Sequence, residues 1–208
     1  MVRVKVCGLT CLEDVDAVVR SGANAVGFVL EPNSPRYVGD LDRLVSLLRR
    51  VPPFVSRVAV FGVLRDLPGD IWREVDVVQF LDPGESVSIP EWVRVVRAVR
   101  LRSADEVQQA MRLQEEADAL LVDAYHPTRL GGTGATADWR LACLLRDLAE
   151  KPVILAGGLT PSNVIDAIVE VQPYAVDVSS GVESAPGKKD HLKVKEFIAN
   201  VRRFADGS

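Results

Sequence analysis

The sequence has few cysteines and histidines for its length. Its 208 residues contain three cysteines, Cys7, Cys11 and Cys143, and two histidines, His126 and His191. The odd, small number of cysteines is too low for a disulfide framework, and no group of histidine and cysteine has the spacing of a zinc site. We therefore expect no metal site, and a mechanism that relies on several histidines is excluded.

Long apolar runs and basic stripes are also missing. No apolar stretch approaches the roughly 18 residues of a membrane span, and the chain reaches a charged residue at Arg3. The 25 lysines and arginines are scattered and are outnumbered by 29 aspartates and glutamates, which leaves a net charge of −4. We therefore expect a cytoplasmic protein with neither nucleic-acid nor membrane partners.

Length and composition are those of one globular domain. Hydrophobic residues make up 48% of the chain and charged residues 26%, which is an ordinary balance for a folded protein. The sequence shows neither a linker-like change of composition nor a low-complexity segment. We expect a single domain over residues 1–208.

Short apolar runs alternate with helical stretches along the chain. The apolar runs predict buried strands near residues 2–6, 25–28, 57–63, 75–79, 93–99, 119–123, 153–156 and 175–178. Apolar periodicity and capping residues predict helices near residues 12–20, 40–50, 69–73, 103–116, 138–150 and 160–171, and a last one ending near 204. This alternation favours a parallel sheet, and eight repeats favour an α/β fold of the closed (β/α)8 TIM-barrel type.

The stretch around the fourth and fifth strands departs from this rhythm. Pro83, Gly84 and Pro90 leave room for only a shortened helix after the fourth strand. Residues 93–99 would be the fifth strand, although a helix continuing from Glu91 fits the same apolar run. The alternative architecture is a doubly wound open sheet, which the lack of Gly-x-Gly-x-x-Gly after the first strand disfavours.

The last two expected strands end in glycine. The seventh stops at Gly157 and Gly158, and the eighth stops shortly before Ser180 and Gly181. Because glycine has no Cβ, peptide N–H groups there can approach an anion closely, and Ser180 adds a hydroxyl. A short helix opening at residues 181–184 would direct its N-terminal dipole to the same point. We predict a phosphate site, as is frequent after strands seven and eight of such barrels, although the glycines could simply end the strands.

Polar residues stand where several other expected strands end. In a parallel barrel these ends converge on one mouth, so Cys7 after the first strand and Asp123 after the sixth would face each other. A thiolate base and a protonated carboxyl acid could move a proton between carbon and oxygen without a cofactor. The pKa of the thiol would have to fall from about 8.5, with Lys5 as a possible helper, and that of the carboxyl would have to rise from about 3.9. The planar fork of Arg36, in a proline-rich loop, is suited to a substrate carboxylate.

Each of these residues also has a purely structural interpretation. Cys7 could be a small buried hydrophobe, and Asp123 could cap a loop or helix. Arg36 could simply be solvated in its loop. Position at a strand end is therefore suggestive for each residue, and their combination in one barrel mouth is what favours a catalytic site.

Five motifs in chain order resemble the phosphoribosylanthranilate isomerase family of tryptophan biosynthesis. Together they cover nearly the whole chain, from the first expected strand to the last helix. The motifs are KVCGLT at residues 5–10, SPRYV at 34–38, LVD at 121–123 with GTG at 132–134, AGGLTPSNV at 156–164, and DVSSGVE at 177–183 followed by PGKKD at 186–190.

This resemblance implies a cofactor-independent Amadori rearrangement of a phosphorylated small molecule. N-(5-phosphoribosyl)anthranilate would become 1-(o-carboxyphenylamino)-1-deoxyribulose 5-phosphate. By the family pattern, Asp123 is the general acid for ring opening, Cys7 is the general base at C2′, and Arg36 holds the anthranilate carboxylate. The phosphate would be held by backbone and hydroxyl groups at Gly157, Gly158, Ser180 and Gly181.

One departure from the family pattern and two alternative functions stay open. The family usually ends its fourth strand with Val-Gln-Leu-His-Gly, whereas Gln79 is followed here by Phe80, Leu81 and Asp82, so a histidine at the mouth is missing. A related histidine-pathway aminoaldose isomerase would place an aspartate where Cys7 stands. A non-catalytic sugar-phosphate-binding barrel would keep the glycine turns without needing both acid and base. The sequence fits either a monomer or a homodimer.

Overall fold

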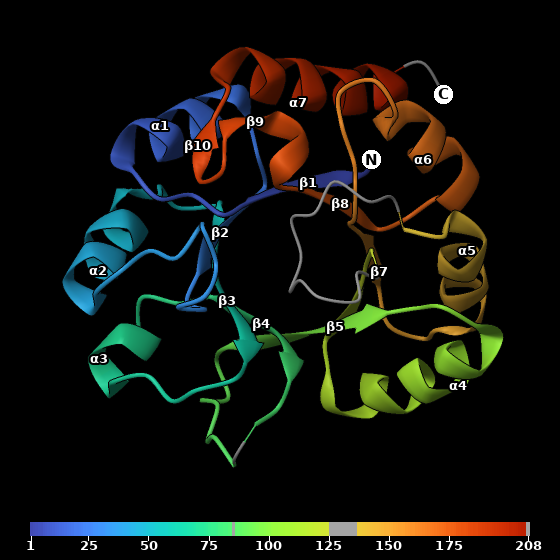
Figure 1. Cartoon of the computed structure of the whole chain (residues 1–208), viewed down its shortest axis with the longest axis horizontal. Helices are drawn as coiled ribbons and strands as arrows, with labels where there is room; N and C mark the ends of the chain where they lie inside the picture. The colour runs from blue at the N-terminus through green and yellow to red at the C-terminus, as the bar shows by residue number, and fades with distance from the viewer. Residues whose placement is uncertain (85, 125–136, 207–208) are drawn as a thin grey trace.

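A closed parallel barrel of eight strands is surrounded by helices in the computed structural model, which describes residues 1–84, 86–124 and 137–206 (Figure 1). Strands that follow one another in the sequence are neighbours in the barrel, and β1 closes the barrel by pairing with β8. The strands are β1 Arg3–Cys7, β2 Ala25–Val29, β3 Ser56–Val63, β4 Val77–Asp82, β5 Arg94–Arg100, β6 Ala119–Asp123, β7 Val153–Leu155 and β8 Ala175–Val178. The predicted (β/α)8 architecture is confirmed, and the open-sheet alternative is wrong.

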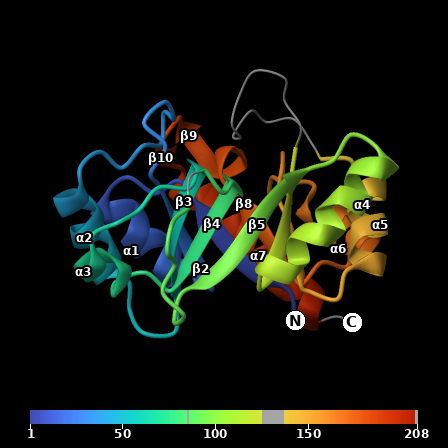
Figure 2. The same cartoon turned by 90° about the horizontal axis from the view of Figure 1, so that it is seen from below.

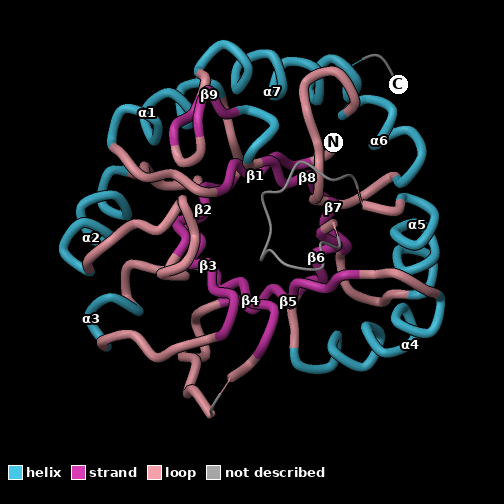
Figure 3. The backbone as a smooth tube through the Cα atoms, in the orientation of Figure 1, coloured by secondary structure: helices cyan, strands magenta, loops and turns pink. Residues whose placement is uncertain are grey.

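The helices form an outer ring in the end-on view (Figure 3) and lie along the side of the barrel in the view turned by 90° (Figure 2). They are α1 Leu12–Ser21, α2 Leu41–Arg50, α3 Gly69–Trp72, α4 Ala104–Leu113, α5 Trp139–Leu148, α6 Val164–Val171 and α7 His191–Asp206, with the 3-10 helices η1 Gln114–Glu116 and η2 Ser180–Val182. None of the described helices is long and apolar enough to cross a membrane.

Side-chain caps start three of the helices where the sequence predicts them. Asp40 accepts a hydrogen bond from the backbone N–H of Arg43 at 2.8 Å, and Asp138 accepts from that of Arg140 at 3.0 Å. Ser103 accepts from the backbone N–H of Glu106 at 3.4 Å, the first half of the predicted capping box. These bonds satisfy N–H groups that have no partner within the helix.

Alternation along the strands divides their side chains between two cores. Those that face the barrel axis form a small cluster: Val96, Ala119, Leu121 and Ala156, with Val77, Ala98 and Ile154 packed against them. The buried hydrophobic side chains on the outward face of the strands join the larger core under the helices. Because side chains alternate with a period of two, Arg100 follows Ala98 and Asp123 follows Leu121 on the axial face. Both side chains therefore point into the C-terminal mouth of the barrel.

The helical ring is thinnest beside β3, β4 and β5. The helix α3 has four residues, and residues 83, 84 and 86–93 between β4 and β5 contain no helix. The helix expected there in shortened form is thus lost from these residues; Gly84, next to Pro83, has a φ of +62°, which a helix cannot contain. The fifth predicted strand is confirmed as β5, so the competing helix from Glu91 is wrong.

Two other boundaries differ from the prediction. Residues 161–163 form a turn and α6 begins only at Val164, because the Asn163 side chain bonds back to the backbone of Thr160 and Gly158. No α-helix opens at residues 181–184. The 3-10 helix η2 is followed there by a hairpin of β9 Glu183–Ala185 and β10 Lys188–Lys189.

Candidate active site

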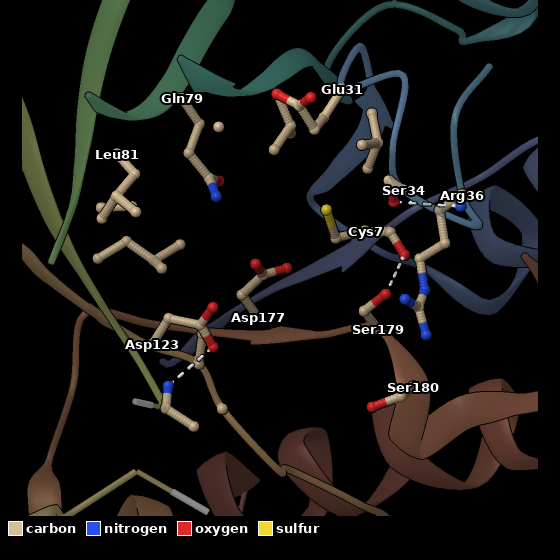
Figure 4. Close-up of a pocket in the computed structure, with 18 of the residues that line it drawn as sticks. Cys7, Glu31, Ser34, Arg36, Gln79, Leu81, Asp123, Asp177, Ser179 and Ser180 are labelled. Atoms are coloured by element: carbon tan, nitrogen blue, oxygen red, sulfur yellow. Dashed lines mark hydrogen bonds between the residues drawn. The ribbon is translucent and has the colours of Figure 1, made fainter. Parts of the chain in front are cut away.

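A pocket opens at the C-terminal mouth of the barrel, and residues from separate strand ends line it (Figure 4). It brings together the predicted residues Cys7, Arg36, Asp123, Gly157, Gly158 and Ser180. Gly181, the next residue of η2, does not line it. The glycine-rich loop at residues 131–134 and His126 lie outside the described residues.

Cys7 ends β1 on the axial face and is 7% exposed. Space for its sulfur comes from Gly27 on β2, where a Cβ would lie 2.8 Å from Cys7 Sγ. Burial raises the pKa of the Cys7 thiol, and the nearby positive charge of Lys5 opposes this without overcoming it. The described residues around Cys7 therefore do not lower the thiol pKa in the way that catalysis by a thiolate requires.

A buried ion pair lies beside Cys7. Lys5 Nζ donates to Asp177 Oδ2 at 2.9 Å, and both side chains are less than 10% exposed. Burial lowers the pKa of Lys5, but Asp177 and Cys7 outweigh burial, so the Lys5 pKa lies above its ordinary value. Lys5 is therefore a fixed positive charge under the pocket.

Asp123 ends β6 on the axial face. Its Oδ1 accepts a hydrogen bond from the backbone N–H of Ala124 at 2.8 Å. Burial raises the pKa of Asp123, while that N–H and the charge of Arg100 oppose the shift. The direction is the one a general acid needs, because a carboxyl with a raised pKa keeps its proton to higher pH.

Arg36 is buried at the rim of the pocket and is held by a carboxylate that the sequence analysis did not single out. Its Nε and Nη2 donate to the two oxygens of Glu183 at 2.8 and 2.6 Å, a bidentate pair. Lys189 Nζ donates to the same carboxylate at 2.9 Å. Burial raises the pKa of Glu183, but its bonds to Arg36 and Lys189 bring it below its ordinary value.

Backbone geometry explains the glycines after β7 and β8. Gly157 and Gly158 have φ angles of +79° and +66°, which residues with a Cβ rarely adopt. A Cβ on Gly157 would collide with the backbone of Ala124, and one on Gly181 would collide with the carbonyl oxygen of Leu159. Gly181 thus allows η2 to pack against the turn after β7, which brings Ser180 to the pocket.

Three charged residues that line the pocket, Asp177, Arg100 and Glu31, are absent from the candidates that the sequence suggests. Asp177 lies between Cys7 and Asp123 in the view of Figure 4, and its Oδ1 is buried without a hydrogen-bond partner among the described residues. Arg100 reaches the pocket from β5. Side-chain alternation along the strands could have indicated Asp177 and Arg100 from the sequence. Asp177 stands two positions before Ser179, and Arg100 stands two positions after Ala98, so both fall on the axial face of their strands.

Residues 1–84, 86–124 and 137–206 contain no candidate metal site. Nowhere in these ranges do three or more histidine, cysteine, aspartate or glutamate side chains gather in a way that could hold a metal ion.

The comparisons with known sequences all point to the same family. The family model described as N-(5'phosphoribosyl)anthranilate (PRA) isomerase matches residues 4–200. The N-(5'-phosphoribosyl)anthranilate isomerase of Chromohalobacter salexigens is 45% identical, over 96% of this chain and 93% of its own. That of Pseudomonas fluorescens is 42% identical, over 97% of this chain and 98% of its own.

Solved structures agree. The phosphoribosyl anthranilate isomerase of Thermotoga maritima superposes with a TM-score of 0.82 and 40% identity, over 98% of this chain and all of the other. A further isomerase structure, in complex with reduced 1-(o-carboxyphenylamino)-1-deoxyribulose 5-phosphate, gives a TM-score of 0.79 and 38% identity over the same shares. A third concerns monomers generated from the dimeric Thermotoga maritima isomerase, so relatives of this chain are known in both states.

Proposed function

The chain belongs to the N-(5'-phosphoribosyl)anthranilate isomerase family of tryptophan-biosynthesis enzymes, and from this premise we propose how its residues carry out the isomerisation. The proposed reaction is the Amadori rearrangement of N-(5-phosphoribosyl)anthranilate to 1-(o-carboxyphenylamino)-1-deoxyribulose 5-phosphate. One observation carries the assignment of roles: Cys7 and Asp123 end separate strands yet line one pocket at the barrel mouth. The binding of the reduced product by a relative with 38% identity supports the choice of substrate.

Asp123 is the proposed general acid of the first step. Its proton passes to the furanose ring oxygen, the bond from C1′ to that oxygen breaks, and the nitrogen lone pair forms a protonated Schiff base. The raised pKa of Asp123 supports this role, because the acid must enter the reaction protonated. After transfer, the new carboxylate keeps its hydrogen bond from Ala124 and the nearby charge of Arg100.

Cys7 is the proposed general base of the second step. It removes the C2′ proton of the Schiff base, which gives an enolamine that tautomerises to the ketone. Since burial raises the thiol pKa, a thiolate base depends on neighbouring positive charge. Lys5 supplies one such charge, and the positive Schiff base formed in the first step supplies another. The acid step comes before the base step because the C2′ proton becomes acidic only once C1′ is part of the protonated Schiff base.

The remaining residues bind the two ends of the substrate. Backbone N–H groups around Gly157, Gly158 and Gly181, with the Ser180 hydroxyl, are proposed to hold the phosphate. Arg36 is proposed to hold the anthranilate carboxylate at the opposite end. The unpartnered Oδ1 of Asp177 is buried and acceptor-only when ionised, so a substrate hydroxyl is its proposed partner.

The test is the decay of phosphoribosylanthranilate fluorescence with purified wild type, Cys7→Ser and Asp123→Asn. We expect rapid decay with wild type and a loss of at least about 10²-fold in kcat for each variant, the lower range for removing a general acid or base. Binding of the reduced product should persist in both variants, since neither side chain is proposed to supply most of the affinity.

A different outcome would point to a different function. A wild type that binds the reduced product without turning over the substrate would favour a non-catalytic sugar-phosphate-binding barrel. Full activity in either variant would remove that residue from its role while leaving the reaction in place. The experiment thus separates the reaction from the assignment of its acid and base.

A further inference from the structure

Arg36, Glu183 and Lys189 form a buried trio of charges at the rim of the pocket. Their exposed fractions are 7%, 9% and 3%. With all three ionised, the trio carries a net charge of +1. A lone Arg36–Glu183 pair would be neutral, so Lys189 restores the positive charge that would attract an anion to this rim.

The bonds within the trio fix the orientation of the Arg36 guanidinium. Glu183 takes the Nε and Nη2 donors at 2.8 and 2.6 Å. Nη1 has no hydrogen-bond partner in the described part of the chain, and Arg36 lines the pocket. The bidentate grip therefore leaves one defined donor edge for a ligand.

Packing restricts the rest of the Arg36 residue. Its aliphatic stem lies over Gly8, where a Cβ would come within 2.5 Å of Arg36 Cδ. Its backbone N–H donates to Ser34 Oγ at 3.1 Å. Gly187, in the β9–β10 turn, packs so closely that a Cβ would lie 2.9 Å from the carbonyl oxygen of Pro35. The aliphatic stem, the backbone and the guanidinium of Arg36 are therefore all held by neighbouring residues.

Lys189 connects the trio to the structure that carries the proposed phosphate loop. Besides Glu183, its Nζ donates to the carbonyl oxygen of Ser179 at 3.2 Å, directly before η2. Its backbone N–H donates to Asp14 Oδ2 in α1 at 2.9 Å. The hairpin that bears Glu183 and Lys189 is thereby tied to two fixed elements, so the trio cannot move as a free loop.

We propose that Glu183 and Lys189 are positioning residues for Arg36. Glu183 orients the guanidinium so that Nη1 meets the carboxylate at the aminobenzoate end of the substrate, and Lys189 keeps the trio net positive. The inference rests on the proposed function, which places that carboxylate in the pocket. Under this proposal Glu183 and Lys189 contribute to substrate binding. Both act through Arg36, and neither touches the substrate.

The test compares two reduced product analogues in calorimetric titrations of the full chain. One is 1-(2-carboxyphenylamino)-1-deoxyribitol 5-phosphate, and the other is the phenylamino compound without the carboxylate. The ratio of their dissociation constants isolates the carboxylate, because phosphate binding and general stability act on both analogues alike. The variants are Glu183→Gln, Lys189→Met, Arg36→Met, Arg36→Lys and the double variant Glu183→Gln/Arg36→Met.

We expect wild type to prefer the carboxylated analogue by about tenfold or more, the scale of a charge-assisted hydrogen bond. Glu183→Gln and Lys189→Met should each reduce that preference at least threefold. Arg36→Met should abolish it, and Glu183→Gln should add nothing in the Arg36→Met background. Arg36→Lys keeps the charge but lacks the fork, so it should lose most of the preference. The wild-type preference tests the proposal even if the buried variants fail to fold.

Kinetics supply a second readout. If the carboxylate is bound equally in ground and transition states, Glu183→Gln should raise KM for phosphoribosylanthranilate while kcat stays within about twofold. Glu74→Gln is the matched control. It removes the carboxylate partner of Arg49 and Arg57 on the outside of the barrel, and it should leave both the preference and KM unchanged.

Three results would overturn the proposal: an unchanged preference in Glu183→Gln and Lys189→Met, equal losses for Glu183→Gln with and without Arg36, or a wild type that binds both analogues equally. Failure of the proposed function looks different. In that case wild type would show no turnover, while the binding ratios would still report whether the trio recognises a carboxylate.

Discussion

The side of the barrel built from β7, β8 and β1 differs from the side built from β3, β4 and β5. On the first side the helices α5, α6 and α7 are complete, and buried charges come in partnered groups, Lys5 with Asp177 and Arg36 with Glu183 and Lys189. On the second side α3 has a single turn, and residues 83, 84 and 86–93 contain no helix.

On the side of β3, β4 and β5, where the helical cover is thin, the arginines Arg97 and Arg100 have no bonded carboxylate among the described residues. Arg97 lies on the outer face of β5, over the ring of Phe80 at 4.7 Å, and its Nε is buried without a hydrogen-bond partner among the described residues. Arg100, on the axial face, also has a buried Nε without such a partner. Burial lowers the pKa of Arg97, as expected for a cation with no carboxylate bonded to it. Buried ion pairs are thus concentrated where the phosphate and the acid–base chemistry are proposed, whereas Arg97 and Arg100 on the opposite wall have no bonded carboxylate among the described residues.

The largest expected difference between the two sides is in how much an ion pair contributes to the free energy of unfolding. Lys5→Met leaves the buried Asp177 without its partner and should reduce the unfolding free energy by about 3–5 kcal/mol at neutral pH. Arg94→Met removes the partner of Asp118 from a pair whose side chains are 71% and 41% exposed, and should cost less than about 1 kcal/mol. Urea unfolding measures both values.

The pH dependence of the Lys5→Met defect has a defined sign. Without Lys5, burial keeps the folded-state pKa of Asp177 above its unfolded value, so Asp177 costs stability wherever it must ionise. That cost is present above the folded pKa and disappears as pH falls to the unfolded pKa. The defect should therefore shrink on acidification. Equal losses for Lys5→Met and Arg94→Met would show that the two sides do not differ in this respect.

A smaller effect is expected from a matched pair of glycine substitutions. An alanine at Gly181 would drive its Cβ into the carbonyl oxygen of Leu159, which is backbone and cannot rotate away. Gly181→Ala should cost about 1–3 kcal/mol, as overpacking does, and weaken binding of the reduced product. Gly69, the first residue of α3, has no atom within 4 Å of an added Cβ. Gly69→Ala should gain up to about 1 kcal/mol by restricting the unfolded chain.

Thermal unfolding and titration with the reduced product measure these outcomes. The comparison holds if Gly181→Ala loses both stability and affinity while Gly69→Ala keeps its affinity. A stable Gly181→Ala with normal affinity would mean that the close packing of η2 against the β7 turn is not needed for the phosphate site.

Local patterns were enough to predict the strands and the convergence of Cys7 and Asp123, because alternation and strand ends are local properties and a closed barrel brings those ends together. Pairings between distant residues were not predictable. Arg36 and Glu183 are 147 residues apart and Lys5 and Asp177 are 172 apart, and only closure of β1 onto β8 and the fold of the hairpin put them in contact. The raised pKa of Cys7 was also missed, since the sequence shows Lys5 nearby but not how deeply the sulfur is buried.

The prediction of short elements and of one helix start was wrong for a related reason. β9 and β10 have three and two residues, so no period can be read from them, and Glu183 was interpreted as part of a helix start. The start of α6 was placed at Thr160 and Pro161 because both residue types favour helix starts. The side chain of Asn163 binds the preceding turn instead, and this delays the helix by one turn.

The smallest predicted effect tests whether the cations of the thin side influence the chemistry. Arg100 and Asp123 are Cα partners across β5 and β6, and both side chains face the axis, yet no ion pair within 4 Å joins them among the described residues. The positive charge of Arg100 favours the ionised form of Asp123 and so opposes the effect of burial on its pKa. Arg100→Gln removes this opposition. The pKa of Asp123 should therefore rise, by only a small amount because the two groups lie beyond bonding distance.

Carbon-13 NMR of the aspartate carboxyls measures the shift directly, with Asp123→Asn to assign the signal and Arg94→Gln as a control that removes a cation from the exposed end of the same strand. The limb of the kcat/KM profile that belongs to Asp123 should move to higher pH by the same amount. An unchanged pKa would make Arg100 a passive wall residue and leave the acid governed by burial and the Ala124 N–H alone. A rise would mean that Arg100, although no bonded carboxylate holds it among the described residues, tunes the acidity of the proposed general acid.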